Sequence, residues 1–480
     1  MFRGGNIQYD VAERARGFAY GGLGAIQQLV HQVGLPEALN QNLHLLKRHQ
    51  PYHESDHVLN IVYNILCGGQ CLQDLERLRH DEVYLDVLGA ARIPDPTTAG
   101  DFCRRFQEAD VIALMEAVNR LRVSIWQSQP SAFFAQAILD ADGVIAETTG
   151  QCKEGMDISY NGRWGYHVLV LSLANTGEPL YLVNRPGNCV SSQSAAPYFD
   201  RALELCFSAG FLVVLMRGDT DFSQTGHLDR WASRPGVLFL FGMDAQPNLV
   251  EIAKDLAPDR WQPLHRPAKY EVRTEPRRRP ENVKARIVKK RKYKNYRLVA
   301  EHVAEFPYRP QKCRQDYRMV VLRKRLSVER GEEVLGEEIR YFFYITNDRT
   351  SSAAEIVRQA NGRCNQENLI AQLQHGVPAL RMPLKTLVSN WAYLVMVALA
   401  WTLKAWLALR LPTQGRWADR HAQEKETLLR MEFKQFRQIF MELPCQIVKT
   451  GRRIVYRLLA WNPWLPVFFR LWRVLYARPG

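Results

Sequence analysis

Three carboxylates of this sequence, Asp142, Asp219 and Glu367, stand where they could act together on a phosphate. Asp142 ends the first predicted strand of an α/β region, Asp219 follows its fourth strand, and Glu367 lies on a predicted helix that returns to the same region. Three carboxylates at one edge of a sheet can hold two divalent ions about 4 Å apart, which activate a water or a 3′-hydroxyl for in-line attack at phosphorus. Carboxylate oxygens suit Mg²⁺ or Mn²⁺, and the lack of a His/Cys ligand set argues against zinc.

The same residues leave plainer interpretations open. A single Asp at the end of a strand is more often a turn cap than a metal ligand. Asp140 lies two residues before Asp142, so both side chains face the same side of the strand and Asp140 is a rival first ligand. Asp221 is a weaker rival of Asp219, because it follows the strand end by two residues. We favour Asp142 and Asp219.

The elements that must position these carboxylates follow a specific order. We predict a strand, a two-strand hairpin, a helix, a doubly buried strand, a short helix and a strand, at 136–142, 166–174, 180–184, 195–209, 211–216, 227–233 and 237–241. This order matches a ribonuclease H-like α/β core better than a Rossmann unit, which needs a helix after its first strand. No Gly-rich phosphate loop follows Asp142. We assign the core to residues 131–245 and 346–412.

The second part of this core is predicted to begin with a helix. Ser351 or Ser352 caps it, and it runs without a break through Arg363, Glu367 and Ile370. Arg363 would then lie one helical turn before Glu367. The plain interpretation of Arg363 is a surface i, i+4 partner of Glu367, worth a few tenths of a kcal/mol.

Between the two parts, residues 246–345 form a basic segment with two predicted strands, 319–322 and 341–345. Its positive side chains are clustered, tyrosines lie among them, and few acidic residues oppose them; the cluster includes Arg277, Arg278, Arg279, Lys289, Lys290, Arg291 and Lys292. Like charges at this density repel one another unless an anion screens them, which favours contact with nucleic-acid phosphates over a solvated loop. The formal net charge of +15 points to the same partner.

The ends of the chain carry weaker signals. Residues 1–130 are predicted to be mostly helical, with a helix over 99–106 capped by Thr97 or Thr98, and residues 413–480 to be a helical segment for DNA or dimer contacts. The apolar run 387–403 is interrupted by polar residues, so we predict a buried core helix and no membrane span. The nine cysteines form no Cys-x-x-Cys pair, and no signal-peptide core begins the chain, so we expect a cytoplasmic protein.

Three blocks of the sequence resemble the catalytic blocks of the DDE transposases of bacterial insertion sequences. They are Leu139-Asp140-Ala141-Asp142-Gly143 with Gly165-Tyr166-His167, then Arg217-Gly218-Asp219-Thr220-Asp221-Phe222, and then Asn361 to Ile370, in which Arg precedes Glu by four. The sequence is most similar to insertion-sequence family 1380, within the wider Tyr-Arg-Glu-Lys transposase group. The resemblance extends from about Gly68 through the closing segment Arg452–Leu458.

This resemblance implies a fold, a metal and a set of ligands. The expected fold class is α/β: a ribonuclease H-like catalytic core interrupted by a largely β insertion, with a helical N-terminal region. Asp142, Asp219 and Glu367 would bind two Mg²⁺ or Mn²⁺ ions, and Arg363 would face the DNA terminus. Three positions depart from the family pattern: Ala360 replaces the signature Tyr, Gln374 the Lys, and Val144 a common Thr.

We therefore expect a DNA transposase that cleaves element ends and joins the freed 3′-hydroxyl to target DNA. The expected partners are double-stranded DNA, as element ends and as target, and a second copy of the chain. Two alternatives stay open: a nuclease on the same core that cuts without joining, and an inactive or diverged DNA-binding remnant, which the three departures leave open although none removes a metal ligand.

Overall fold

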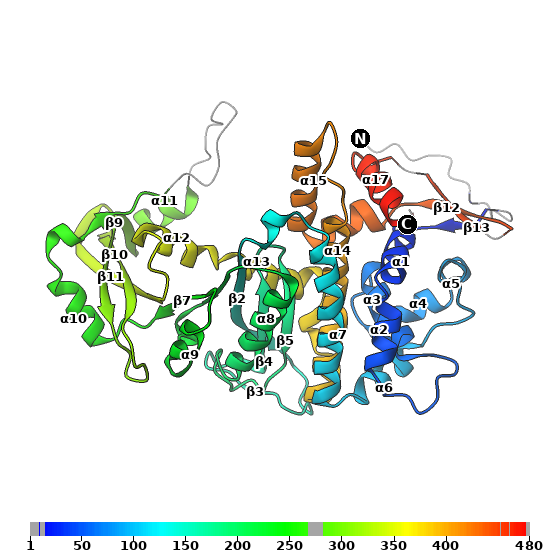
Figure 1. Ribbon diagram of the computed structural model, residues 1–480, viewed down its shortest axis with the longest axis horizontal. Helices are drawn as coiled ribbons and strands as arrows, with labels where there is room; N and C mark the ends of the chain where they lie inside the picture. Colours follow the sequence, from blue (N-terminus) through cyan, green and yellow to red (C-terminus); the bar gives the residue numbers. More distant parts are fainter. Residues whose placement is uncertain (1–8, 10–14, 267–281, 452, 460, 477–480) are drawn as a thin grey trace.

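The computed structural model describes residues 9, 15–266, 282–451, 453–459 and 461–476. It is a mixed α/β protein in which one long sheet runs from its middle to one end and helices gather at the other end (Figure 1). Helices α1 (Leu23–Gln32) and α17 (Leu465–Tyr476), from the two ends of the described chain, pack against each other at the helical end (Figure 1). The helical N-terminal region and the α/β core expected from the sequence are both present.

One end of the sheet, in the middle of the protein, has five strands in the order β5-β4-β2-β6-β7. Their bounds are Glu178–Val183, Trp164–Leu173, Ala137–Glu147, Val214–Gly218 and Val237–Met243, and the short β3, Asp157–Ile158, pairs with β4. The pairs β2–β4 and β4–β5 are antiparallel, whereas β2–β6 and β6–β7 are parallel. The predicted strand at 211–216 begins later than expected, at Val214, because Leu212 is 74% exposed and Phe211 packs against Phe133 and Phe134.

The basic segment extends this same sheet. Strands β9, β10 and β11 span Lys294–Tyr308, Tyr317–Arg330 and Glu333–Thr346; β8 is Gln262–Pro263, and the helices are α10, Pro247–Asp255, and α11, Val283–Lys290. Strand β11 pairs antiparallel with β7, so the insertion continues the core sheet directly. The strands are longer than predicted. The prediction relied on apolar alternation, and the outer half of β11 is mostly exposed and shows no such alternation.

Helices cover both faces of the sheet. Met216 of β6 belongs to the core cluster that holds Phe199 of α8, Ala195–Ala209, whereas Leu215 packs with Ile356 and Val357 of α12, Ala353–Gly362. Successive residues of a strand point to opposite faces, so α8 and α12 lie on opposite faces. Two shorter helices, α9 and α13, span Leu228–Ala232 and Asn365–Ala371.

The helical end is built around α14, Leu387–Leu409, which lies between the sheet and the N-terminal helices (Figure 1). Those helices are α1 to α7: Leu23–Gln32, Leu35–Asn42, Glu54–Leu66, Leu75–Arg79, Glu82–Leu88, Pro96–Arg104 and Glu108–Gln127. Helix α14 is long and apolar enough to cross a membrane, but its most apolar window is wholly buried inside the protein. It is therefore the core helix that the sequence predicted.

Two local predictions at this end were wrong. The cap of α6 is Asp95, whose carboxylate accepts from the backbone N–H groups of Thr97 and Thr98, at 2.9 and 3.0 Å. The segment 413–480 is not purely helical. Its helices are α15, α16 and α17 (Ala418–Arg430, Phe433–Phe436 and Leu465–Tyr476). Between α16 and α17 it forms a hairpin of β12, Cys445–Thr450, and β13, Arg453–Leu458. The hairpin pairs with β1, Gly17–Phe18, a long-range contact that local sequence does not encode.

A buried polar cluster joins α7, the β4–β5 hairpin and α14. Arg122 and Glu178 are 1% and 0% exposed, and Arg122 Nε lies 3.0 Å from Glu178 Oε1. The indole N–H groups of Trp126 and Trp406 donate to the same carboxylate, at 2.9 and 3.0 Å. Arg122 Nη2 donates to the Pro179 carbonyl at 2.9 Å. The cluster therefore connects three elements through one ion pair.

Lys404 of α14 gives the protein a pH-dependent stability. Its ammonium group is fully buried, donates to the Leu429 carbonyl at 2.9 Å and lies over the Trp401 ring, and burial lowers its pKa to about 7. Between this pKa and the ordinary value near 10.4 the unfolded chain binds the extra proton, so the free energy of unfolding rises with pH in that window.

We therefore expect the difference in free energy of urea unfolding between wild type and Lys404→Met to grow in favour of wild type from pH 7 to pH 9. It should stay flat below pH 6, where Lys404 is protonated in both states. A difference that is constant from pH 6 to pH 9 would show that the pKa of Lys404 is not lowered.

Candidate active site

The first two carboxylates come from neighbouring parallel strands. Asp140 of β2 is in register with Arg217 of β6, and two further residues along each chain bring Asp142 beside Asp219. Asp219 directly follows β6 and caps a short 3-10 turn, its Oδ1 accepting from the Asp221 N–H at 3.0 Å. Asp219 therefore does serve as a turn cap. Burial is the main cause that raises the pKa of Asp219, and the charge of Asp142 is the second.

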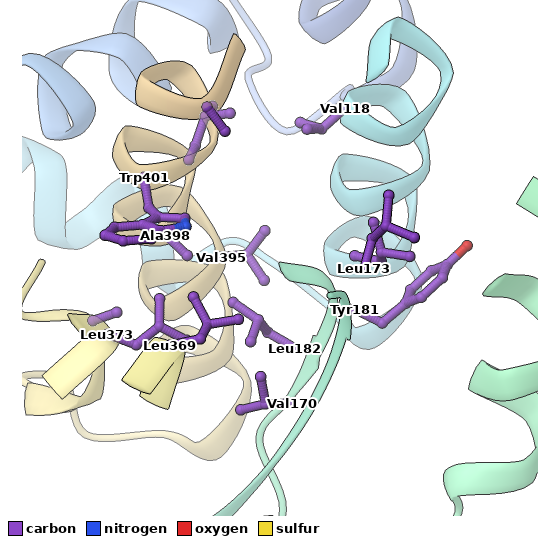
Figure 2. Close-up of a cluster of buried hydrophobic side chains, with 14 of the residues drawn as sticks. Val118, Val170, Leu173, Tyr181, Leu182, Leu369, Leu373, Val395, Ala398 and Trp401 are labelled. Carbon is purple, nitrogen blue, oxygen red and sulfur yellow. The ribbon is translucent and has the colours of Figure 1, made fainter. Parts of the chain in front are cut away.

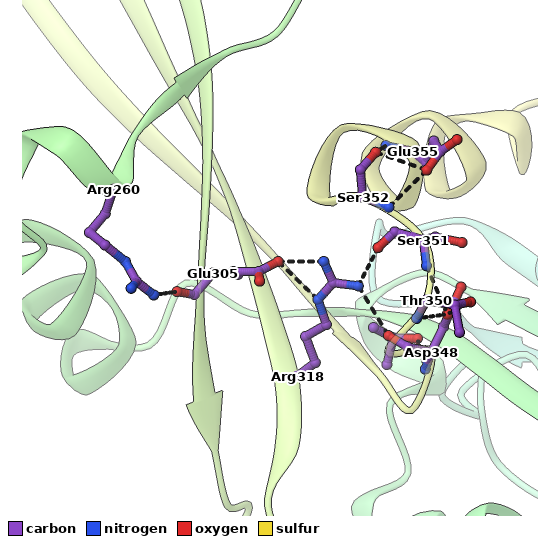
Figure 3. Close-up of polar contacts among 9 residues, drawn as sticks. Arg260, Glu305, Arg318, Asp348, Thr350, Ser351, Ser352 and Glu355 are labelled. Carbon is purple, nitrogen blue, oxygen red and sulfur yellow. Dashed lines mark hydrogen bonds and ion pairs between the residues drawn. The ribbon is translucent and has the colours of Figure 1, made fainter.

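A polar network fixes the start of α12 against the insertion (Figure 3). Arg318 of β10 pairs with Glu305 of β9 and donates to the backbone carbonyls of Asp348 and Ser351, at 3.1 and 2.5 Å. Ser352 then caps α12 in a reciprocal capping box with Glu355. The predicted cap at Ser352 is confirmed, and the insertion is tied to the helix that leads to Arg363.

The predicted continuous helix is instead two helices. Helix α12 ends at Gly362, Arg363 and Cys364 form a turn, and α13 begins at Asn365. Gly362 packs on Arg217, where an added Cβ would lie 2.8 Å from Arg217 Nη1. A side chain at this position would displace the Arg217 guanidinium, and the turn at Arg363 and Cys364 interrupts the predicted continuous helix.

Helix α13 is held against both the sheet and α14. Gln366 is 2% exposed, donates to the Val170 carbonyl at 3.0 Å and accepts from Ser172 Oγ at 2.5 Å. Leu369 and the following Leu373 pack toward α14, in the same cluster as its residues Val395, Ala398 and Trp401 (Figure 2). Glu367 is left exposed in the first turn of α13, and its charge contributes to raising the pKa of Asp142.

Arg363 lies among the carboxylates. Its Nη1 is 2.7 Å from Asp142 Oδ2, and the two side chains are 19% and 15% exposed. Burial raises the pKa of Asp142, while the Arg363 charge opposes that rise. Burial alone would lower the pKa of Arg363, but the charges of Asp142 and Asp219 outweigh it and raise that pKa. The ion-pair partner of Arg363 is therefore Asp142, and not Glu367 as in the plain interpretation of its position.

Asp140 has a different environment from Asp142. It is 1% exposed and forms a two-pronged ion pair with Arg217, with Nε–Oδ1 and Nη2–Oδ2 distances of 2.7 and 2.8 Å. Arg217 also donates to the Gln359 carbonyl at 2.7 Å. Both oxygens of Asp140 are thus held inside the protein, which favours Asp142 as the available ligand. No local pattern indicated the roles of Arg217 and Gln366, because both depend on contacts between distant segments.

The two aspartates should respond differently to removal of their charge. We expect Asp140→Asn to lower the free energy of unfolding by about 3–5 kcal/mol, because it leaves the buried Arg217 charge without its partner. Asp142→Asn should cost clearly less, because it also removes a negative charge that repels Asp219 and Glu367. Urea unfolding in EDTA measures both values. Equal losses for the two variants would contradict this division of roles.

The donor set fits a hard divalent cation. Asp142, Asp219 and Glu367 supply the oxygen ligands that Mg²⁺ and Mn²⁺ prefer. Burial and the charge of Glu367 both raise the pKa of Asp142, as burial and the charge of Asp142 raise that of Asp219. Among the described residues, no three His, Cys, Asp or Glu side chains are close enough together to hold an ion as they stand. The positive charge beside Asp142 is supplied by Arg363.

The basic residues of the insertion lie elsewhere. Arg277, Arg278 and Arg279 fall outside the described residues. Lys289, Lys290, Arg291 and Lys292 are exposed at the end of α11, and Lys289 Nζ lies 2.7 Å from Glu332 Oε1. Helix α11 is far from α13, at the outer part of the insertion (Figure 1). The described part of this cluster, Lys289 to Lys292, therefore does not lie at the carboxylates.

The structure shows a mixed α/β protein in which Asp142 and Asp219 lie at neighbouring strands, and comparison with known proteins shows its family. Residues 18–478 match the family described as "Transposase DDE domain group 1", so the chain belongs to this family of DDE transposases. Family membership implies a DNA-cleaving enzyme. No curated protein matches the sequence significantly. A cryo-EM structure of the piggyBac transposase synaptic complex with hairpin DNA is similar over 89% of this chain and 81% of that chain, with a TM-score of 0.39 and 10% identity.

Proposed function

We propose that this protein is a transposase of an insertion sequence of family 1380, which cleaves the element ends and joins each freed 3′-hydroxyl to target DNA. The observation that supports the proposal is where the three carboxylates lie relative to the strands of the sheet. Asp142 lies on the central β2, Asp219 follows the parallel β6, and Glu367 lies on α13, which packs on β2. The order β5-β4-β2-β6-β7, with its two antiparallel and two parallel pairings, supports a ribonuclease H-like core.

In this proposal Asp142, Asp219 and Glu367 hold two Mg²⁺ or Mn²⁺ ions. When bound, such ions activate the attacking oxygen and stabilise the leaving oxygen of an in-line displacement. The protein supplies the frame: parallel strands fix the two aspartates, and Gln366 with Leu369 fixes α13 and hence Glu367. A rigid frame of this kind keeps the ligands in place during the reaction.

The exposed end of α11 is proposed to contact DNA phosphates. Lys290, Arg291 and Lys292 are exposed, and Tyr293 and Tyr296 beside them are 53% and 39% exposed. Two phosphate contacts fewer reduce the slope of log affinity against log salt by about two. We expect this reduction for the double variant Lys290→Ala/Arg291→Ala when its DNA affinity is measured by fluorescence anisotropy from about 50 to about 200 mM KCl. An unchanged slope would remove α11 from the DNA interface.

The proposal is tested with a plasmid-borne element that carries its natural flanks, incubated with the protein and Mg²⁺ or Mn²⁺. Excision together with joining of 3′ ends to a second plasmid is the expected result. Cleavage without joining would replace the proposal with a nuclease. Binding of the ends without cleavage would indicate a DNA-binding remnant, an outcome that the departures at Ala360 and Gln374 leave open. Ala360 is partly buried and Gln374 is exposed.

A further inference from the structure

Both carboxylate oxygens of Asp142 already have partners. Oδ1 accepts from the Gly143 N–H at 2.8 Å, and Oδ2 accepts from Arg363 Nη1 at 2.7 Å. Each oxygen has a second lone pair, so hydrogen bonding alone does not exclude a metal ion. A guanidinium in direct contact with the carboxylate does oppose one, because two cations at one ligand repel strongly in a partly desolvated site. Arg363 and a divalent ion therefore compete for Asp142.

Arg363 is the partner that can leave. The Gly143 N–H belongs to the backbone of β2 and cannot move without the strand. Arg363 instead stands in the turn between α12 and α13, and its long side chain is partly exposed. Its charge also acts on Asp219, so one side chain compensates two of the three carboxylates. Movement of that side chain would expose both negative charges together.

We propose that Arg363 is a built-in counterion that DNA removes. A DNA end entering the site offers phosphates, which a guanidinium binds in the same fork geometry as a carboxylate. Arg363 passes from Asp142 to a phosphate, and Asp142 becomes available to a divalent ion. Because coupling between two binding equilibria is reciprocal, DNA then raises the affinity for metal and metal raises the affinity for DNA. This inference rests on the proposed function and adds an order of assembly to it.

The experiment measures Mn²⁺ binding by the EPR signal of free Mn²⁺, with and without a duplex of the element's own terminal sequence. For wild type the duplex is expected to raise the Mn²⁺ affinity at least about fivefold, the lower end of typical coupling. Arg363→Gln should bind Mn²⁺ at least about fivefold more tightly than wild type without DNA, because the competitor is gone. The duplex should then have no further effect on its Mn²⁺ affinity.

Two matched variants make the result specific. Arg358→Gln removes an exposed charge from α12 and should behave as wild type. Arg363→Lys keeps the charge and should retain part of the duplex effect, which shows that a change in Arg363→Gln is not caused by misfolding. If Arg363→Gln binds Mn²⁺ no more tightly than wild type in the absence of DNA, this inference is overturned, but the proposed function is not. Mn²⁺ binding that is insensitive to Asp219→Asn would overturn the proposed metal site and this inference together.

Discussion

Asp142→Asn, Asp219→Asn and Glu367→Gln are each expected to slow cleavage of an element end by about a thousandfold or more. A bound metal ion contributes several kcal/mol to transition-state stabilisation, and each 1.36 kcal/mol is a factor of ten in rate. Affinity for the DNA end measured in EDTA, where no metal is coupled to binding, should not fall, because each substitution removes a negative charge from a surface that receives phosphates. Single-turnover cleavage of a labelled duplex and anisotropy titration separate the two effects.

The matched control for this prediction is Asp221→Asn. Asp221 is two residues from Asp219 and exposed, and its contact with Asp219 is made by its backbone N–H, which the substitution keeps. It should cleave at close to the wild-type rate. Loss of activity in Asp221→Asn with retention in Asp219→Asn would show that the second ligand was assigned two residues too early. Activity in Asp142→Asn would remove β2 from the metal site.

Glu178→Gln is expected to have the largest effect on stability. The amide keeps the shape of the side chain but leaves the fully buried Arg122 charge uncompensated, and it cannot accept from both Trp126 and Trp406 as the carboxylate does. Breaking a buried ion pair by removing one partner costs about 3–5 kcal/mol. The urea midpoint of unfolding should fall accordingly, with an unchanged slope.

A surface pair provides the comparison for Glu178. Arg234 Nη2 lies 2.9 Å from Glu204 Oε1, but the side chains are 31% and 71% exposed. Glu204→Gln should therefore change the free energy of unfolding by less than about 1 kcal/mol. If Glu178→Gln and Glu204→Gln shift the midpoint equally, the buried cluster does not stabilise the junction of α7, β5 and α14. Replacing Arg122 with Met in the Glu178→Gln background should recover part of the loss, since it removes the unpaired charge.

Much of the frame of the site could be predicted from local patterns. Alternating and continuous apolar runs located β2, β4, β5, β6 and β7, and an amphipathic period together with Gly210 located α8 at its observed bounds. Strands predicted in that order place Asp142 and Asp219 on neighbouring elements. This part succeeded because the period of the apolar residues is a local property of the sequence.

The rest depends on contacts between distant residues. Nothing near Asp140 indicates that Arg217 will neutralise it, so Asp140 and Asp142 were equivalent by pattern. The break between α12 and α13 directly follows Gly362, which approaches Arg217, and this contact between distant segments cannot be seen in a local pattern. The outer parts of β9 and β11 are polar and exposed, so their pairing, and not their composition, makes them strands. Arg363 was predicted beside Glu367 because an unbroken helix was assumed.

The most direct test of the central claim is a change of metal preference at Asp219. In Asp219→Cys a thiolate replaces the carboxylate; Mg²⁺ prefers oxygen ligands, whereas a transition-metal ion accepts sulfur more readily. We predict that Asp219→Cys does not cleave the element end in Mg²⁺ but recovers cleavage in Mn²⁺, to a rate well above that of Asp219→Asn in the same metal. Wild-type cleavage by Asp219→Cys in Mg²⁺, or equal rates for the Cys and Asn variants in Mn²⁺, would contradict a metal ligand at Asp219.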